Sequence, residues 1–181
     1  MLELSLHILD LIENSVRAGA KVIAVSVVER PEEDRLEIVV EDNGHNFPVS
    51  HEKALDPFFT TKEGKRTGLG LSLFKASVEQ ADGTLTLGAS SLGGAAVKAT
   101  MQLSHVDRVP LGDIASTISS VVCTNPEIDL RFRMRVGGRE IQTRVSEVLK
   151  ELKPKDRHGL EVARKLHERI KAALDEVGAL Q

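Results

Sequence analysis

The first forty residues carry a helical apolar period followed by two β-rich runs. From Ser5 to about Ala18, apolar residues recur every three or four positions, the spacing of one helix face, and Gly19 offers a left-handed stop. Residues 22–28 and 36–40 are rich in β-branched side chains and flank a polar connector. The pattern predicts an amphipathic helix and then two strands.

The next sixty residues predict a second helix and a second pair of strands. Residues 45–67 contain prolines and glycines and have no apolar period, which is typical of a loop. A helix is expected over 69–80, followed by strands over 84–87 and 96–103 that are joined through Gly93-Gly94. The expected order is therefore helix, strand, strand, loop, helix, strand, strand.

The last third of the chain predicts helices on both sides of a hairpin. After a linker over 105–112, helices are expected over 113–122, 146–152 and 160–178. Between the first two of these helices, apolar residues alternate with arginines over 129–136. That alternation predicts a strand with one buried face.

Gly137-Gly138 supplies the two-residue turn of this hairpin and pairs Met134 with Ile141. The register gathers the apolar side chains on one face. It leaves four arginines on the other, namely Arg131, Arg133, Arg135 and Arg144. The arginine face is most simply a solvated strand face, and an acidic partner protein is the alternative.

Composition places the chain among soluble globular proteins. Of its 181 residues, 41% are hydrophobic and 28% are charged, and no apolar run is long enough to cross a bilayer. Glu3 and Asp10 interrupt the amino-terminal apolar stretch and no basic leader precedes it, so no secretory signal is expected. The single Cys123 fits a reducing compartment. We therefore expect a cytoplasmic protein without a membrane segment.

The net charge of −3 is unevenly distributed along the chain. Residues 1–128 carry 11 basic and 18 acidic side chains, a balance of −7, whereas residues 129–181 carry 13 and 9, a balance of +4. This asymmetry is too mild to predict nucleic-acid binding. With no Trp or Tyr and five Phe, the chain also has few side chains that stack on bases. No nucleic-acid partner is expected.

Three separated segments hold the candidate chemistry. In the first helix Asp10, Asn14 and Arg17 lie three and four residues apart and share one face. A carboxylate, an amide oxygen and a guanidinium can together orient water, ligate a hard cation and hold phosphate. By itself such a stripe is more often a solvated helix face.

The second segment, Asp42-Asn43-Gly44, ends the second strand. Gly44 lets a ligand approach the backbone, and Asp42 can accept a hydrogen bond from an exocyclic amine. Adenine carries that amine where guanine carries a carbonyl oxygen, so the carboxylate favours ATP over GTP. An ordinary turn is the alternative interpretation of the tripeptide.

The third segment covers residues 56–71 and places Gly68 and Gly70 at the entry to a helix. Glycines there expose backbone N–H groups at the positive end of the helix dipole, which suits a polyphosphate. The spacing is neither that of a Walker loop nor that of a Rossmann fingerprint.

Together these segments resemble the nucleotide-binding boxes of the GHKL superfamily of ATPases and histidine kinases. The boxes are Asp-Leu-Ile-Glu-Asn-Ser at 10–15, Glu-Asp-Asn-Gly at 41–44, Asp-Pro-Phe-Phe-Thr-Thr-Lys at 56–62 and Gly-Leu-Gly-Leu-Ser-Leu at 68–73. The resemblance covers about residues 5–103. It implies an α+β Bergerat fold, a two-layer sandwich with helices on one face of a mixed sheet. An ATP-binding domain is then expected over 1–104, and a small C-terminal α/β extension over 105–181.

The resemblance also implies roles for individual residues. Asn14 would ligate Mg²⁺, Asp42 would bind the adenine amine, and Asp10 would be the catalytic base. The other positions that would contact the nucleotide are Arg17, Gly44, Asn46, Lys62, Thr67, Gly68, Leu69, Gly70 and Leu71. ATP and Mg²⁺ are the implied cofactors.

Four positions, in three places along the chain, depart from the family pattern. Asp10 stands where family ATPases have glutamate, so its carboxylate reaches one methylene less far. Asn46 replaces the usual second glycine after the adenine-binding aspartate, and Ala95-Ala96 replace a hydroxyl residue after Gly93-Gly94. These departures predict weaker adenine binding and leave ATP turnover open.

Three functions remain open at this point. The first is a phosphotransferase that acts on a separate partner protein, as anti-sigma serine kinases and trans-acting histidine kinases do. The second is an ATPase switch that forms a homodimer when it closes over nucleotide, and the third is a non-catalytic nucleotide sensor that controls a partner.

The flanking regions add two expectations. Because the chain begins almost at the first box, no upstream helix with a phosphoacceptor histidine is expected. His7 is the only histidine near the site, and a histidine on a helix face is more often structural than a phosphoacceptor. The tail after residue 105 resembles stand-alone ATP-binding proteins encoded near iron-only hydrogenase genes, which implies a regulatory partner.

Overall fold

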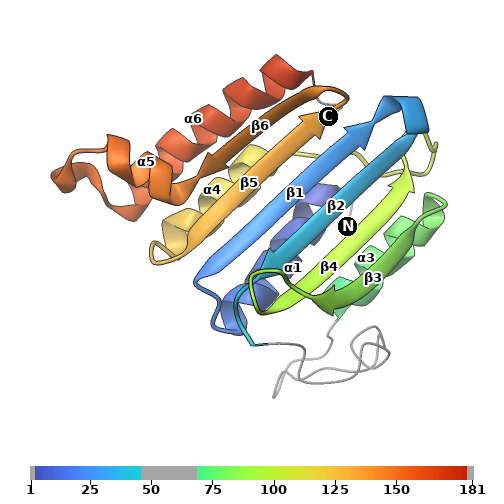
Figure 1. Cartoon of the computed structure of the whole chain (residues 1–181), viewed down its shortest axis with the longest axis horizontal. Coiled ribbons are helices and arrows are strands. Elements are labelled where there is room, and N and C mark those ends of the chain that lie inside the picture. The colour runs from blue at the N-terminus through green and yellow to red at the C-terminus, as the bar shows by residue number, and fades with distance from the viewer. Residues whose placement is uncertain (1–2, 46–68, 179–181) are drawn as a thin grey trace.

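The structure is a computed structural model that describes residues 3–45 and 69–178 (Figure 1). The first half contains α1 (Leu4–Arg17), β1 (Val22–Arg30), β2 (Arg35–Asp42), α3 (Leu69–Gln80), β3 (Thr84–Ala89) and β4 (Ala95–Gln102). The second half contains α4 (Ile114–Thr124), β5 (Asp129–Val136), β6 (Arg139–Arg144), α5 (Val145–Glu151) and α6 (Gly159–Val177). Each predicted helix and strand is present, and the predicted ends agree with the observed ones to within two residues. The short 3₁₀ turns at Pro31–Glu33 and Pro154–Asp156 were not predicted.

The six strands of the described residues form one sheet in the order β3-β4-β2-β1-β5-β6 (Figure 1). Neighbouring strands are antiparallel except β1 and β5, which run parallel with Val22 opposite Asp129 and Glu29 opposite Val136. The sheet is therefore mixed, as predicted. Because β5 pairs directly with β1, the strands after residue 105 extend the sheet of the first half. The division into two domains at residue 104 stays a prediction.

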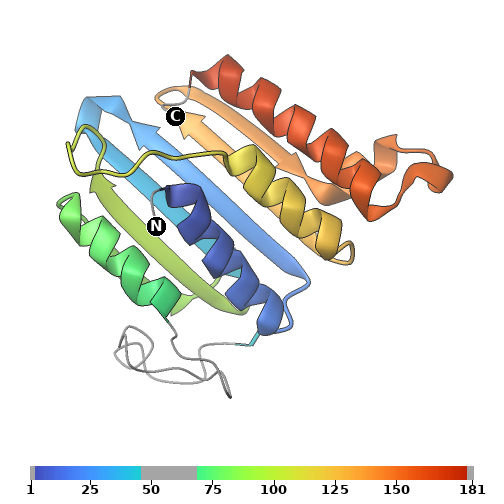
Figure 2. The ribbon, with the colours of Figure 1, turned by 180° about the vertical axis from the view of Figure 1, so that it is seen from behind.

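The helices lie on one face of the sheet, which confirms the predicted α+β sandwich (Figure 2). Alternate strand residues point toward them, and in β2 these are Leu36, Ile38 and Val40, none more than 2% exposed. One hydrophobic core runs from α1 to α6 beneath the helices. Within the described ranges, no helix has the length and apolarity needed to cross a bilayer.

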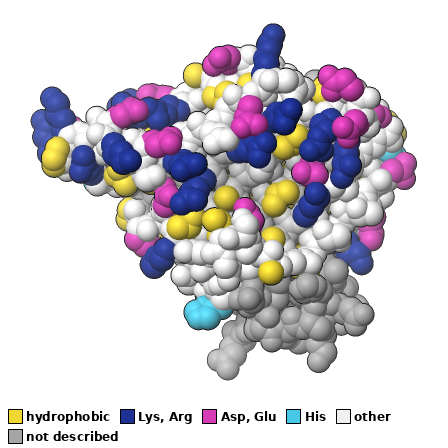
Figure 3. Space-filling view, in the orientation of Figure 1, with side chains coloured by type: hydrophobic (Ala, Val, Ile, Leu, Met, Phe, Trp, Pro, Cys, Tyr) yellow, Lys and Arg dark blue, Asp and Glu magenta, His cyan; other side chains and the backbone are white. Residues whose placement is uncertain are grey.

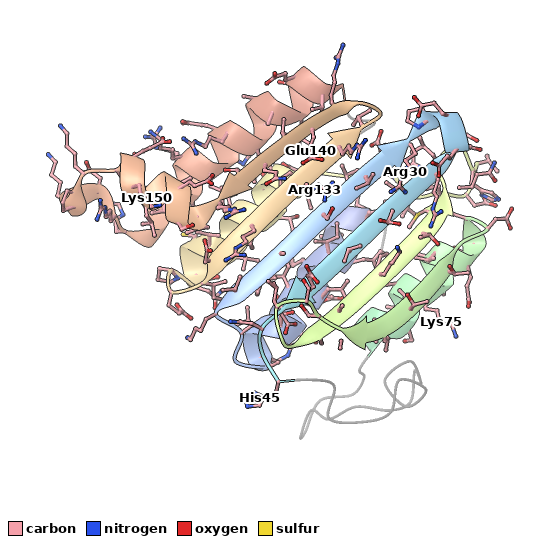
Figure 4. All side chains as sticks on the ribbon, viewed as in Figure 1. Arg30, His45, Lys75, Arg133, Glu140 and Lys150 are labelled. Carbon is pink, nitrogen blue, oxygen red and sulfur yellow. The ribbon has the colours of Figure 1, made fainter. Side chains whose placement is uncertain are left out.

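The hairpin has the predicted register, with Met134 opposite Ile141. Gly137 turns the chain with φ at +55°, a backbone conformation that glycine adopts at little cost. The β5 arginines alternate with buried residues and face the uncovered side of the sheet, where basic side chains gather in Figure 3. Arg133 there pairs with Glu140 of β6 at 2.9 Å (Figure 4).

The segment between β4 and α4 anchors the start of α1. The backbone N–H groups of Leu4 and Ser5 donate to the carbonyl oxygens of Pro110 and Leu111, at 2.9 and 2.8 Å. The first N–H groups of a helix have no partner inside it, and the Glu3 side chain at the N-cap accepts no capping bond. The chain after residue 105 therefore helps to hold the helix that carries the first candidate segment.

Candidate functional site

The predicted site residues that the structure describes lie at one end of the sheet. The last turns of α1, the end of β2 and the first turn of α3 meet there, at the lower edge of Figures 1 and 2. The turn between β3 and β4 lies beside them, because the Gly94 N–H donates to the Asp42 carbonyl oxygen at 3.0 Å. The fold thus brings Asp42 to the same end of the sheet as Asp10 and Asn14 of α1, about thirty residues earlier in the sequence.

Asp42 is held firmly within this site. The residue is 4% exposed. Its Oδ1 accepts hydrogen bonds from the N–H groups of Gly44 at 2.9 Å and Ala95 at 3.2 Å. Its Oδ2 accepts from the Ser15 hydroxyl at 2.5 Å. Donors from three parts of the chain therefore orient the carboxylate before any ligand arrives.

Two glycines near this carboxylate have no space for a side chain. A Cβ on Gly94 would lie 2.3 Å from Asp42 Oδ1, and a Cβ on Gly44 would lie 2.8 Å from the Ala18 carbonyl oxygen. A side chain at either position would force its neighbours to move. Gly44 was among the predicted site residues, whereas Gly94 was expected only as part of a turn.

Asp10 lies against the start of α3. Asp10 is half-buried on α1, and a Cβ on Gly70 would lie 2.8 Å from its Oδ2. The positive end of a helix dipole stabilises a nearby carboxylate and also attracts anions such as phosphate. The candidate base and a predicted phosphate-binding glycine are therefore direct neighbours.

Asn14 and Arg17 are exposed on the last turns of α1. The Arg17 guanidinium donates to Asn14 Oδ1 and forms an ion pair with Glu13 at 3.4 Å. Asn14 Oδ1 is the atom predicted to ligate Mg²⁺, so a cation at that oxygen must displace or share the guanidinium. The exposed pair of Glu13 and Arg17 agrees with a helix-stabilising role for Glu13.

The remaining predicted contacts belong to the third segment and its surroundings. Leu69 is the first residue of α3, and Leu71, 8% exposed, packs its side chain into the core. Leu71 can therefore face a ligand only through its backbone. Four predicted positions lie outside the described residues: Asn46, Lys62, Thr67 and Gly68.

Ser15 is a site residue that the sequence analysis missed. It is 5% exposed and continues the buried stripe of α1 formed by Ile8, Leu11 and Ile12. A hydroxyl where the helix period expects an apolar side chain indicates a buried polar partner. That signal was available in the sequence, but it could not identify the partner as Asp42, 27 residues away.

The histidines nearest the site differ in burial. His7 is 1% exposed and stacks on Phe74, with the ring centroids 4.9 Å apart. Burial is the main reason that the pKa of His7 falls from 6.5 to about 4. A buried ring cannot reach a phosphoryl group, which argues against His7 as a phosphoacceptor. His45 is exposed at the site end of the sheet (Figure 4), and its Nδ1 lies 2.8 Å from the Ala18 carbonyl oxygen.

The donors of the site suit a cation that arrives with a nucleotide. In the part of the chain that the structure describes, no group of three His, Cys, Asp or Glu side chains could hold a metal ion. Asn14 offers one amide oxygen, about one helical turn after the half-buried Asp10. Mg²⁺ commonly completes such a sparse set of protein ligands with phosphate oxygens and water. The residues therefore fit Mg²⁺ bound to nucleotide.

The sequence also matches known proteins. Residues 2–105 match the family described as histidine kinase-, DNA gyrase B-, and HSP90-like ATPase. The sensor kinase CckA of Brucella abortus (strain 2308) is 49% identical over 55 residues. That match covers 29% of this chain and 6% of the kinase, so the chain spans a small fraction of this relative.

Three solved structures are similar to this chain. The N-terminal domain of a DNA repair protein has a TM-score of 0.51 and 13% identity, over 80% of this chain and 52% of that chain. The Aquifex aeolicus MutL ATPase domain complexed with ADP has a TM-score of 0.49 and 16% identity, over 91% and 70%. The ATP-binding domain of PrrB from Mycobacterium tuberculosis has a TM-score of 0.41 and 26% identity, over 54% and 66%.

The similarity to the DNA repair protein domain supports the fold alone. The family assignment rests on the sequence match. That match, over residues 2–105, covers more than half of the 181 residues and includes the four boxes. The mixed sheet with helices on one face agrees with it. The chain therefore belongs to the family of histidine kinase-, DNA gyrase B- and HSP90-like ATPases.

Proposed function

We propose that this protein binds ATP with Mg²⁺ and transfers the terminal phosphoryl group to a separate partner protein. The observation that carries the proposal is the buried Asp42 carboxylate, which donors from Gly44, Ala95 and Ser15 hold in place. A carboxylate held in this way accepts from the exocyclic amine of adenine and offers nothing to a carbonyl oxygen. This chemistry favours ATP over GTP.

The phosphates would lie toward α3. The first N–H groups of that helix and its dipole attract anionic oxygens, and Gly70 in its first turn has no side chain. Asn14 would give one oxygen to Mg²⁺, which would neutralise part of the phosphate charge. Arg17, once released from Asn14, would bind a phosphate oxygen. By family resemblance, Lys62 and Gly68 would complete the phosphate site.

Asp10 would assist the transfer. An acceptor hydroxyl or imidazole would attack the γ-phosphorus, the bond to the β-phosphate oxygen would break, and ADP would leave. The proton released by the acceptor would pass to the Asp10 carboxylate. Its place beside Gly70, at the start of α3, supports this role because the phosphates are proposed to lie there.

A nucleotide-controlled switch is the second candidate function. The Arg17 guanidinium donates to Asn14 Oδ1, so a metal ion at that oxygen must displace the Arg17 side chain or share Asn14 with it. Such a rearrangement could report bound nucleotide to a partner, or to a second copy of the chain, without phosphoryl transfer. If Asp10 oriented a water molecule instead of an acceptor, hydrolysis would reset the switch.

A labelling experiment separates these functions. Mg-ATP binding is measured first by calorimetry on the purified protein. The protein is then incubated with γ-labelled Mg-ATP, alone and with proteins encoded beside its gene. Label on a partner supports phosphotransfer, free phosphate alone supports an ATPase switch, and binding without either supports a sensor. If Mg-ATP does not bind, the proposal is wrong at its first step.

Matched variants assign the roles of the polar side chains. Asp10→Asn keeps the size of the side chain and removes the base, so transfer should slow by about a hundredfold while Mg-ATP still binds. Asn14→Ala should weaken the magnesium-dependent part of binding. Glu13→Gln, on the exposed side of the same helix, should change neither measurement.

A further inference from the structure

Ser15 and Asp42 form a buried contact between two parts of the site. Ser15 is 5% exposed on α1, and Asp42 is 4% exposed at the end of β2. The Ser15 hydroxyl donates to Asp42 Oδ2 at 2.5 Å, at the short end for a bond to a carboxylate. This bond ties the helix that carries Asn14 to the strand that carries the proposed adenine acceptor.

The two oxygens of Asp42 are used unequally. Oδ1 accepts two N–H groups, from Gly44 and Ala95, so both of its lone pairs in the carboxylate plane are engaged. Among the residues that the structure describes, Oδ2 accepts only from Ser15, which leaves it one lone pair. Oδ2 is therefore the oxygen that remains available to a nucleotide base.

Ser15 and Asp42 together have no hydrogen-bond donor left to offer a ligand. A hydroxyl has one hydrogen, and that of Ser15 is committed to Asp42 Oδ2. The pair therefore presents only acceptors. An exocyclic amine can donate to them, whereas a carbonyl oxygen would meet like partial charge and lose its own partner.

We propose that Ser15 is a positioning residue that sets the preference of this site for an aminopurine over an oxopurine nucleotide. This inference rests on the proposed ATP site. Without the Ser15 hydroxyl, Asp42 Oδ2 loses its donor while Gly44 and Ala95 still hold Oδ1, and a water molecule in the vacated space can donate to a carbonyl oxygen. A purely structural serine would change stability, or the affinity for both kinds of nucleotide together, without changing their ratio.

The test compares Mg-ATP with Mg-ITP, in which a carbonyl oxygen replaces the adenine amine. Calorimetry on the full chain gives Kd for each nucleotide, and urea unfolding gives stability. In Ser15→Ala we expect ATP affinity to fall about tenfold and the ATP-to-ITP preference to fall by about the same factor. Ser15→Thr keeps the hydroxyl and should restore the wild-type preference.

Ser119→Ala is the matched control, because Ser119 is 8% exposed on α4 and donates to the Ala115 carbonyl oxygen at 2.7 Å. It should leave both nucleotide affinities unchanged. An unchanged ATP-to-ITP ratio in Ser15→Ala overturns the inference. If that variant does not fold, the ratio in Ser15→Cys decides, since a thiol is a weak donor of similar size. A wild-type chain that binds neither nucleotide overturns the ATP site itself, which is a distinct result.

Discussion

The buried imidazole of His7 should make the stability of the fold depend on pH. The side chain of His7 in α1 is 1% exposed and stacks on Phe74 of α3. Neither ring nitrogen has a hydrogen-bond partner among the described residues. Burial, as the main cause, lowers the pKa of His7 from 6.5 to about 4.

The direction of the pH dependence is set by the unfolded chain, which binds the proton more readily than the folded chain. Above pH 6.5 the imidazole is neutral in both the folded and the unfolded chain, so it contributes no pH dependence. Below pH 6.5 the unfolded chain binds a proton that the folded chain binds only near pH 4, so unfolding becomes easier as pH falls. With these two pKa values, the loss of folding free energy at pH 4.5 is about 2.5 kcal/mol.

Urea unfolding at pH 7.0 and pH 4.5 tests this prediction. Circular dichroism is the suitable signal, because the chain has no Trp or Tyr. His7→Leu keeps an apolar side chain of similar volume and removes the titration. Its loss of stability between the two pH values should be smaller than that of the wild type by about 2.5 kcal/mol.

Other titrating groups cancel in this comparison because they are shared by both proteins. His158→Gln is the control, since His158 is exposed at the start of α6 and its substitution should follow the wild type at both pH values. Equal losses in wild type and His7→Leu would refute the conclusion that burial of His7 opposes its protonation.

Two glycine substitutions test the close contacts of the site. Gly94→Ala places a Cβ 2.3 Å from Asp42 Oδ1, so Mg-ATP affinity measured by calorimetry should fall at least about tenfold. Gly88→Ala, where a Cβ meets nothing within 4 Å, should leave the Mg-ATP affinity unchanged. Equal Mg-ATP affinities in Gly94→Ala and the wild type would contradict the predicted crowding at Asp42. Gly70→Ala places a Cβ 2.8 Å from Asp10 Oδ2 and should slow phosphoryl transfer or ATP turnover more than it weakens binding. The preference of a helix for alanine should offset part of the crowding, so its urea midpoint should change little; wild-type turnover would show that Asp10 can move without cost.

The features that could be predicted from the sequence are those determined by residues close together along the chain. The two-residue turn at Gly137-Gly138 leaves one register for the hairpin, so the pairing of Met134 with Ile141 followed from the pattern alone. The parallel pairing of β1 with β5 did not. An alternating strand indicates which face is buried, but it does not indicate which distant strand lies alongside.

The same distinction applies to the site. Asp42 and Gly44 could be identified because they sit together in a short motif at a strand end. The surroundings of Asp42 could not, because its donors come from the side chain of Ser15 in α1 and the backbone of Ala95 in β4. A backbone N–H carries no residue-specific signal, so its role appears only when the chain is folded.

The pairing of β1 with β5 has a practical meaning for the nucleotide-binding part of the chain. In a fragment that ends at residue 104, the β1 backbone groups that face β5, from Val22 to Glu29, would have no strand beside them. An open, apolar strand edge is a template for association with other chains and for fibril growth. We therefore expect a fragment that ends at residue 104 to associate more readily than the full chain, in which the C-terminal hairpin covers this edge.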